Sequence, residues 1–171
     1  MMSTEFLVSL ARLPSGPGSC RPISLRGGFD SDVVIGLVVL PAGRAVAVEG
    51  TVEAVGEGVL ATARVRATLD ATCSRCLTGF SYDTEVELRE LFVRDGRGSD
   101  DEESRIHNDS IDLADVARDA IVLDAPLIPL CAPDCAGLCQ SCGADLNADP
   151  DHCHEEPDPR WLGLGQWGKM S

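Results

Sequence analysis

Residues 61–70, ATARVRATLD, alternate small or apolar side chains with polar or charged ones, which is the period of a half-buried β-strand. The odd-numbered positions would face a hydrophobic core, and the even-numbered positions would face solvent. Residues 45–55 alternate in the same way, and Gly56 and Gly58 supply a turn between the two segments. Together the two segments predict a β-hairpin.

The chain on either side of this hairpin predicts further strands. Residues 82–89 alternate again, and Cys73 and Cys76 fall in the turn before them, at the tip of a second hairpin. The continuous apolar run at 33–40, VVIGLVVL, predicts one buried strand. Residues 5–13 form a short apolar segment that fits either a strand or a helical turn.

One helix is predicted, over about residues 112–124. Its apolar residues recur at helical spacing: Leu113, Val116, Ala117, Ala120 and Ile121. Ser110 or Asp112 can cap its first amides, and Pro126 ends it. Residues 95–110 before it are acidic and predict a solvated loop.

These elements predict an α+β fold. It would consist of an antiparallel, partly closed meander sheet, one main packing helix and a C-terminal Cys/His zinc-binding appendage. The predicted core domain covers residues 1–130, and the predicted cysteine-rich tail covers residues 131–171 and packs on that core.

Composition indicates where such a chain would work. The 171 residues are 44% hydrophobic, enough for one core of ordinary size. No run of about 18 apolar residues predicts a membrane helix, and the first residues make a poor signal peptide. We therefore expect a cytoplasmic protein, and in a reducing compartment closely spaced cysteines are more often metal ligands than disulfides.

The formal net charge of -14 disfavours direct binding to nucleic acid, because the field of the molecule repels phosphates. A basic partner, such as a ribosomal protein, fits this charge better, although a local arginine patch leaves contact with RNA open. The sequence contains no Ser/His/Asp set, no P-loop and no carboxylate pair in an apolar setting. We therefore predict that the chain is not an enzyme, and no small-molecule substrate is evident.

The eight cysteines carry the chemical signal. Cys139 and Cys142 have the spacing of a zinc knuckle, and Gly143 after them lets the turn close toward the sulfurs. A redox pair would require a strand before it and a helix after it, whereas coil rich in Pro and Gly surrounds this one. Cys73 and Cys76 have the same spacing at a hairpin tip, with a turn holding two idle thiols as the alternative. Cys20 has no cysteine or histidine at ligand spacing and is predicted to be idle.

Several motifs in combination resemble the YceD family, the bacterial large ribosomal RNA subunit accumulation proteins. They are Cys73-Ser-Arg-Cys76-Leu77, Pro126-Leu-Ile-Pro-Leu-Cys131, Cys135, Gly137-Leu-Cys139-Gln-Ser-Cys142-Gly143 and Asp158-Pro-Arg160-Trp161. The likeness extends to residues 10–18 and to the strands from Val46 onward. It implies a non-enzymatic factor needed for normal accumulation of large-subunit ribosomal RNA, with a ribosomal precursor particle or a basic ribosomal protein as the expected partner.

Two arrangements of structural zinc are then open. In the first, Cys73 and Cys76 share one ion with Cys131 and Cys135, and a second ion takes Cys139, Cys142, His152 and His154, with Cys153 as an alternate ligand. In the second, four tail cysteines (Cys131, Cys135, Cys139 and Cys142) share one ion, and Cys73 and Cys76 are left over. We prefer the first, because each ion then has the four ligands that structural zinc takes.

Two other functions remain open from the sequence. Oxidation of the thiols would release zinc and expose apolar surface in a redox-switched chaperone or sensor. A nucleic-acid-binding zinc ribbon would require a basic face, which the net charge disfavours. Residues 158–161 (Asp-Pro-Arg-Trp), with Leu162, Leu164 and Trp167 after them, form a candidate docking segment, or Trp161 covers the zinc region.

Overall fold

The computed structural model describes residues 4–154, apart from 12, 14–15, 17, 57 and 95–103. Trp161 and the predicted docking segment therefore lie outside the described residues, as does most of the predicted acidic loop. No helix in the described part of the chain is long and apolar enough to cross a membrane.

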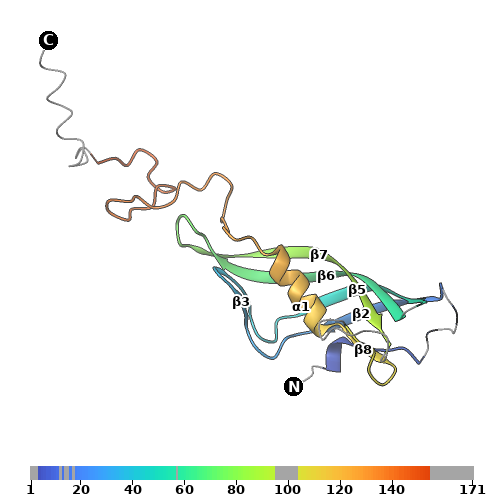
Figure 1. The fold of residues 1–171 in the computed structure, drawn as a ribbon. Coiled ribbons are helices and arrows are strands. Elements are labelled where there is room, and N and C mark those ends of the chain that lie inside the picture. Colours follow the sequence, from blue (N-terminus) through green and yellow to red (C-terminus); the bar gives the residue numbers. More distant parts are fainter. Residues whose placement is uncertain are drawn as a thin grey trace, which may run out of the picture.

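An antiparallel sheet with one helix forms the body of the protein, as Figure 1 shows. The six-stranded sheet has the order β2-β5-β6-β4-β3, and β7 pairs with the other edge of β6. Its strands are β2 (Cys20–Gly27), β3 (Val33–Ile35), β4 (Val38–Leu40), β5 (Val46–Val55), β6 (Gly58–Thr72) and β7 (Gly79–Val93). The α+β class is confirmed. Partial closure is not, because no ladder joins β2 to β7 among the described residues.

The long strands follow the sequence pattern closely. Alternate residues of β6 from Ala61 to Ala71 are buried, and Val46, Val48 and Val52 of β5 are buried beside them. The predicted hairpins β5–β6 and β6–β7 are both present, and their registers run without interruption. One face of the sheet therefore forms the core.

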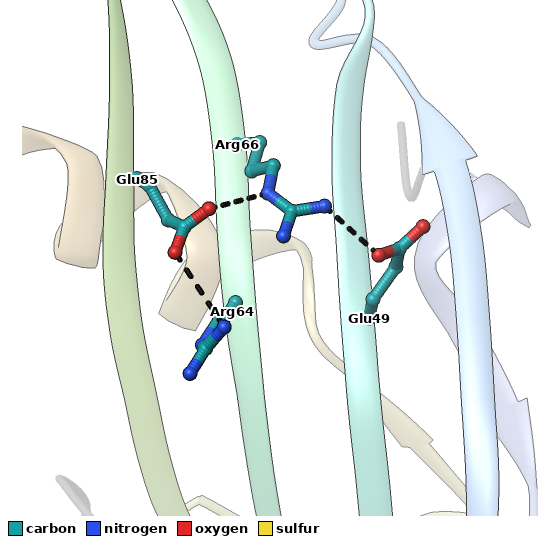
Figure 2. Close-up of polar contacts among 4 residues, drawn as sticks. All are labelled: Glu49, Arg64, Arg66 and Glu85. Carbon is teal, nitrogen blue, oxygen red and sulfur yellow. Dashed lines mark hydrogen bonds and ion pairs between the residues drawn. The ribbon is translucent and has the colours of Figure 1, made fainter.

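The opposite face of the sheet is polar and carries a ladder of charges. Figure 2 shows Arg66 of β6 between Glu49 of β5 and Glu85 of β7, at 3.0 and 2.6 Å, with Arg64 beside Glu85. The hydrogen bond from Arg66 is the main cause that lowers the pKa of Glu85 below its usual range. These side chains are half exposed, so the ladder contributes little stability.

Two parts of the predicted strand pattern were wrong or incomplete. The apolar run at 33–40 is not one strand. Gly36 adopts a φ of 58° and breaks the run into the hairpin β3–β4, whose register pairs Val33 with Leu40. Strand β2 was not predicted, because Pro22 and its polar neighbours hide the alternation.

The N-terminal segment forms a short 3-10 helix, η1 (Thr4–Phe6), followed by β1 (Leu7–Ser9). Strand β1 pairs with β8 (Ser110–Asp112), which leads into the helix. Phe6 and Val8 are buried, so this ribbon completes the core beside the sheet. The sequence predicted loop as far as residue 110, whereas Ser110 already belongs to β8.

Helix α1 (Ala114–Asp124) begins two residues later than predicted. Asp112 accepts a hydrogen bond from the amide of Ala114 at 2.9 Å, so its side chain supports the first turn. Ala117 and Ile121 are fully buried against the sheet. Pro126 follows the end of the helix, and the chain then continues without helix or strand past the tip of the β6–β7 hairpin (Figure 1). The domain boundary near residue 130 stays a prediction.

Candidate metal centres

The tip of the β6–β7 hairpin is a tight turn that contains Cys73 and Cys76. The amide of Leu77 donates to the carbonyl of Cys73 at 3.0 Å, and the amide of Cys73 donates to the carbonyl of Thr78 at 2.9 Å. Leu77 adopts a φ of 59°, the left-handed conformation that leucine rarely takes. This backbone turns the chain so that both cysteine side chains lie on its inner side.

Cys139 and Cys142 lie in a turn with the same hydrogen bonds. The amide of Gly143 donates to the carbonyl of Cys139 at 2.8 Å, and the amide of Cys139 donates to the carbonyl of Ala144 at 2.8 Å. Gly143 has a φ of 76°, which matches the position of Leu77 in the first turn. Two turns that lie far apart in the sequence therefore share one backbone design, and we call each of them a knuckle (residues 73–78 and 139–144).

The first knuckle meets two cysteines from the residues that follow α1. The Sγ atoms of Cys73 and Cys135 lie 3.8 Å apart, and those of Cys76 and Cys131 lie 3.6 Å apart. Four sulfurs at about 2.3 Å from a tetrahedral zinc ion would be about 3.8 Å from one another. A disulfide requires about 2.05 Å, and all of these cysteines are free. The spacing therefore fits a metal ion better than it fits a disulfide.

Backbone contacts hold the tail against the hairpin tip at this group, which we name cluster 1 (Cys73, Cys76, Cys131 and Cys135). The amide of Ser74 donates to the carbonyl of Pro129 at 2.9 Å, and the amide of Leu138 donates to the carbonyl of Arg75 at 3.1 Å. Arg75 also donates from Nη1 to the carbonyl of Cys135 at 2.8 Å. The tail is thus positioned from both sides of Cys131 and Cys135.

Cluster 1 is largely shielded from solvent. Cys73 is 0%, Cys135 3% and Cys76 8% exposed, whereas Cys131 is exposed. Phe80, Leu130 and Leu138 pack around the buried sulfurs. This apolar cover forms a small second core that joins the hairpin tip to the tail.

Hydrogen bonds in cluster 1 favour the thiolate form of Cys73 and Cys76. The backbone amides of Cys76 and Cys131 lower the pKa of Cys73 to about 6. The hydroxyl and then the amide of Thr78 lower the pKa of Cys76. Cys131 behaves oppositely, because its hydrogen bond with Cys76 raises its pKa to about 12. Amide donors aimed at sulfur are the usual support of metal-binding cysteines, since thiolate is the form that binds.

The second knuckle meets His152 and His154, and we name this group cluster 2 (Cys139, Cys142, His152 and His154). His152 Nε2 lies 3.1 Å from Cys142 Sγ and 3.2 Å from His154 Nε2. Two imidazole nitrogens at about 2.0 Å from one zinc ion would lie about 3.3 Å apart. All four ligand atoms of cluster 2 lie within 4.8 Å of one another, and the same holds for cluster 1.

Neighbouring groups support both clusters. The amides of Cys142 and Ser141 lower the pKa of Cys139 to about 6. Asp149 Oδ2 lies 3.9 Å from His152 Nδ1, which is near the ring but longer than a hydrogen bond. Asn147 donates from Nδ2 to Cys135 Sγ at 3.6 Å. Asn147 belongs to the segment that carries cluster 2, so the two clusters are linked.

The structure groups the ligand atoms as in the first arrangement, whereas the second would gather the four tail cysteines. That either cluster binds zinc stays a prediction. Cys153 and Cys20 are exposed and belong to neither cluster. The sequence reasoning missed the contributions of Arg75 and Asn147, since no motif marks these residues.

Comparison with known proteins places this chain in a family. The family model described as "Large ribosomal RNA subunit accumulation protein YceD" matches residues 61–166, which is well over half of the chain. This chain belongs to the YceD family. The matched part of this YceD protein begins in β6 and includes every residue of both clusters.

Curated relatives of this YceD protein occur in mycobacteria. Uncharacterized proteins of Mycobacterium bovis and Mycobacterium tuberculosis are each 36% identical to it over 168 residues, covering 95% of this chain and 81% of the relative. An uncharacterized protein of Mycobacterium leprae is 34% identical over 133 residues, covering 75% of this chain and 61% of the relative. No solved structure matches this YceD protein.

Cluster 2 is expected to contribute less to stability than cluster 1. His152→Ala is expected to remove one of two bound zinc ions, because His152 lies beside both Cys142 and His154. Unfolding free energy should change by less than about 1 kcal/mol, since the cluster lies near the surface, away from the core. Zinc analysis and denaturant titration measure the two quantities. The exposed His107→Ala serves as the control, and retention of both ions in His152→Ala would contradict the prediction.

Proposed function

We propose that this chain is a cytoplasmic, non-enzymatic accessory factor in large ribosomal subunit biogenesis, acting as a zinc-stabilised binding module. Membership of the YceD family carries the biological part of the proposal, because the family is described by accumulation of large ribosomal RNA. The grouping of eight ligand atoms into two four-ligand sets supports the zinc.

Zinc would act as a structural crosslink in this proposal. Each cluster supplies four Cys or His ligands, which leaves no open position for water or substrate. A bound ion would hold all four cysteines as thiolates and would fix Cys131 and Cys135 to Cys73 and Cys76. The residues of cluster 1 fit this role, because three of its four cysteines are buried and backbone amides donate hydrogen bonds to the sulfur of Cys73.

The partner we propose is a ribosomal precursor particle or a basic ribosomal protein. The formal net charge of -14 supports a basic protein surface as the direct contact. The arginines on the polar sheet face support the same choice, because Arg64 and Arg66 already lie against Glu85 and Glu49. Cations engaged in this way form no open basic patch for a phosphate backbone.

The proposal is tested in a deletion strain complemented with tagged protein. Ribosomal RNA of the large subunit should fall relative to that of the small subunit in the deletion strain, and wild-type protein should restore it. On sucrose gradients the tagged protein should travel with precursors of the large subunit. Normal ribosomal RNA in the deletion strain, together with protein found only at the top of the gradient, would contradict the proposal.

An experiment on the purified protein distinguishes this proposal from a redox-switched chaperone. Peroxide treatment followed with a zinc-release dye should show that cluster 1 resists oxidation, since three of its four sulfurs are buried. Rapid release of zinc together with a gain of holdase activity would favour the switch instead.

A further inference from the structure

Among the residues that the structure describes, strand β7 has a long outer edge that pairs with no other strand. It is the outermost strand on its side of β6. No described residue pairs with the outer edge of β7 before Val93, which forms a bridge with Arg105. The amide of Val93 donates to Ser104 and its carbonyl accepts from Ile106, both away from β6. Because backbone direction alternates along a strand, the other odd-numbered residues of β7 also direct their N–H and C=O groups outward.

Among the described residues, the other edge of the sheet is the more protected of the two, although charged side chains such as Glu85, Glu87 and Arg89 lie along β7. Strand β2 has 8 residues, and Pro22 in it lacks an amide at a position that faces away from β5. Strand β7 has 15 residues, contains no proline and runs in unbroken register with β6, without a bulge. An uninterrupted edge of this length is a template for another strand.

A groove of about 660 Å³ runs between this edge and helix α1. Its apolar lining comes from both elements: Val86 and Leu88 of β7, and Val116, Ala120 and Leu123 of α1. Leu123 is 86% exposed, which is unusual for a leucine beside a core. A strand added to β7 would place every second side chain over this lining.

The rim of the groove is acidic. It carries five carboxylates, which are Glu87, Glu90, Asp115, Asp119 and Asp124, whereas Arg89 is its only cation among the described lining residues. Arg118 lies 2.9 Å from Asp115 and 3.5 Å from Asp119. Ser104 donates to Glu90 and Thr84 donates to Asp124. The excess of negative charge remains after these contacts, so the rim favours a cationic occupant.

We propose that the groove between β7 and α1 binds an extended basic segment of a partner protein, which adds to the sheet as a strand beside β7. Main-chain hydrogen bonds from the odd-numbered residues of β7 supply affinity. Alternate apolar side chains of the segment lie on the groove lining, and its Lys or Arg residues face the acidic rim. The binding mode is independent of whether the partner is ribosomal, so failure of the function proposed above does not remove it.

A second copy of this chain is a poorer occupant of the same edge. Two copies would bring identical acidic rims together, and each copy carries a net charge of -14. Like charges at an interface cost free energy, whereas a basic segment gains it. The charge therefore selects a different protein as the partner.

The test uses the zinc-loaded full chain and a fluorescent peptide of about ten residues that alternates Lys or Arg with Val or Thr. Wild-type protein should bind this peptide, and amide resonances of odd-numbered β7 residues should shift on binding. Glu87→Pro removes one outward amide and should weaken binding at least about tenfold, whereas Glu87→Ala keeps the amide and should weaken it far less.

The same peptide also tests whether the acidic rim attracts a basic segment and whether a second copy of the chain occupies the groove instead. Asp119→Lys should also weaken binding about tenfold, and Glu53→Lys, on β5 outside the groove, should not. This pair keeps the test decisive where Glu87→Pro does not fold. Equal binding by a Glu/Val peptide, unchanged binding by Asp119→Lys, or a wild-type dimer that Glu87→Pro dissociates would each overturn the proposal.

Discussion

Cys135→Ser is expected to lower the free energy of unfolding by about 4 kcal/mol or more, because it removes a ligand from the buried cluster that joins the tail to the hairpin tip, and loss of a buried structural metal belongs to the largest single-site effects. Cys135 is 3% exposed, its sulfur lies 3.8 Å from that of Cys73, and Phe80 and Leu138 cover the group. Serine would remove one of four ligands and leave a hydroxyl beside the buried sulfurs of Cys73 and Cys76. Guanidinium titration of zinc-loaded protein measures the loss.

Cys20→Ser is the matched control for this substitution. Cys20 is an exposed free thiol on the edge strand β2 and belongs to neither cluster. Its replacement should change the unfolding free energy by less than about 0.5 kcal/mol. If the two variants were equally stable, cluster 1 would not be the clamp described here.

Ile121→Ala is the second change with a large expected effect, about 2 to 5 kcal/mol of unfolding free energy. The side chain of Ile121 is 0% exposed and lies on the face of α1 that packs on the sheet. Its truncation would leave a cavity between helix and sheet that the surrounding strands cannot fill. Thermal and denaturant unfolding of the purified variant check the value.

Leu123→Ala provides the comparison within the same helix. Leu123 is 86% exposed, so its loss should leave unfolding unchanged within about 0.5 kcal/mol. The same variant should weaken the peptide described above, since Leu123 lines the groove. A large loss of stability in Leu123→Ala, or none in Ile121→Ala, would contradict the placement of the helix.

Much of the fold could be predicted because the long strands have one buried face. The alternation along residues 61–70 is visible without an alignment, and the structure buries the odd positions as expected. The run at 33–40 lacks alternation, so nothing in it separates one strand from a hairpin except Gly36. Strand β2 was missed because its position at the sheet edge tolerates Pro22.

The candidate metal sites could also be predicted only in part. Spacing and Gly143 predicted the second knuckle, because a glycine there allows the left-handed turn that Leu77 makes in the first knuckle at some cost. Which cysteines share an ion depends on where the tail crosses the hairpin tip. That crossing depends on backbone bonds such as the one from Ser74 to Pro129, which no local pattern predicts.

Cluster 1 and the groove beside β7 would have different roles. Cluster 1 would hold the tail to the hairpin tip, and the groove beside β7 would hold a partner. Both adjoin strand β7. The first knuckle lies directly before Gly79, the first residue of β7, and the groove begins at Val86. Loss of zinc is therefore expected to disturb the start of the strand to which the partner would add.

Native mass spectrometry of protein purified without oxygen tests the central claim most directly, because it counts bound ions on the intact chain. We predict two zinc ions per chain, one of which is lost in Cys135→Ser and the other in His152→Ala. A wild-type chain that carries no metal, with all eight cysteines open to alkylation in the folded state, would contradict the account.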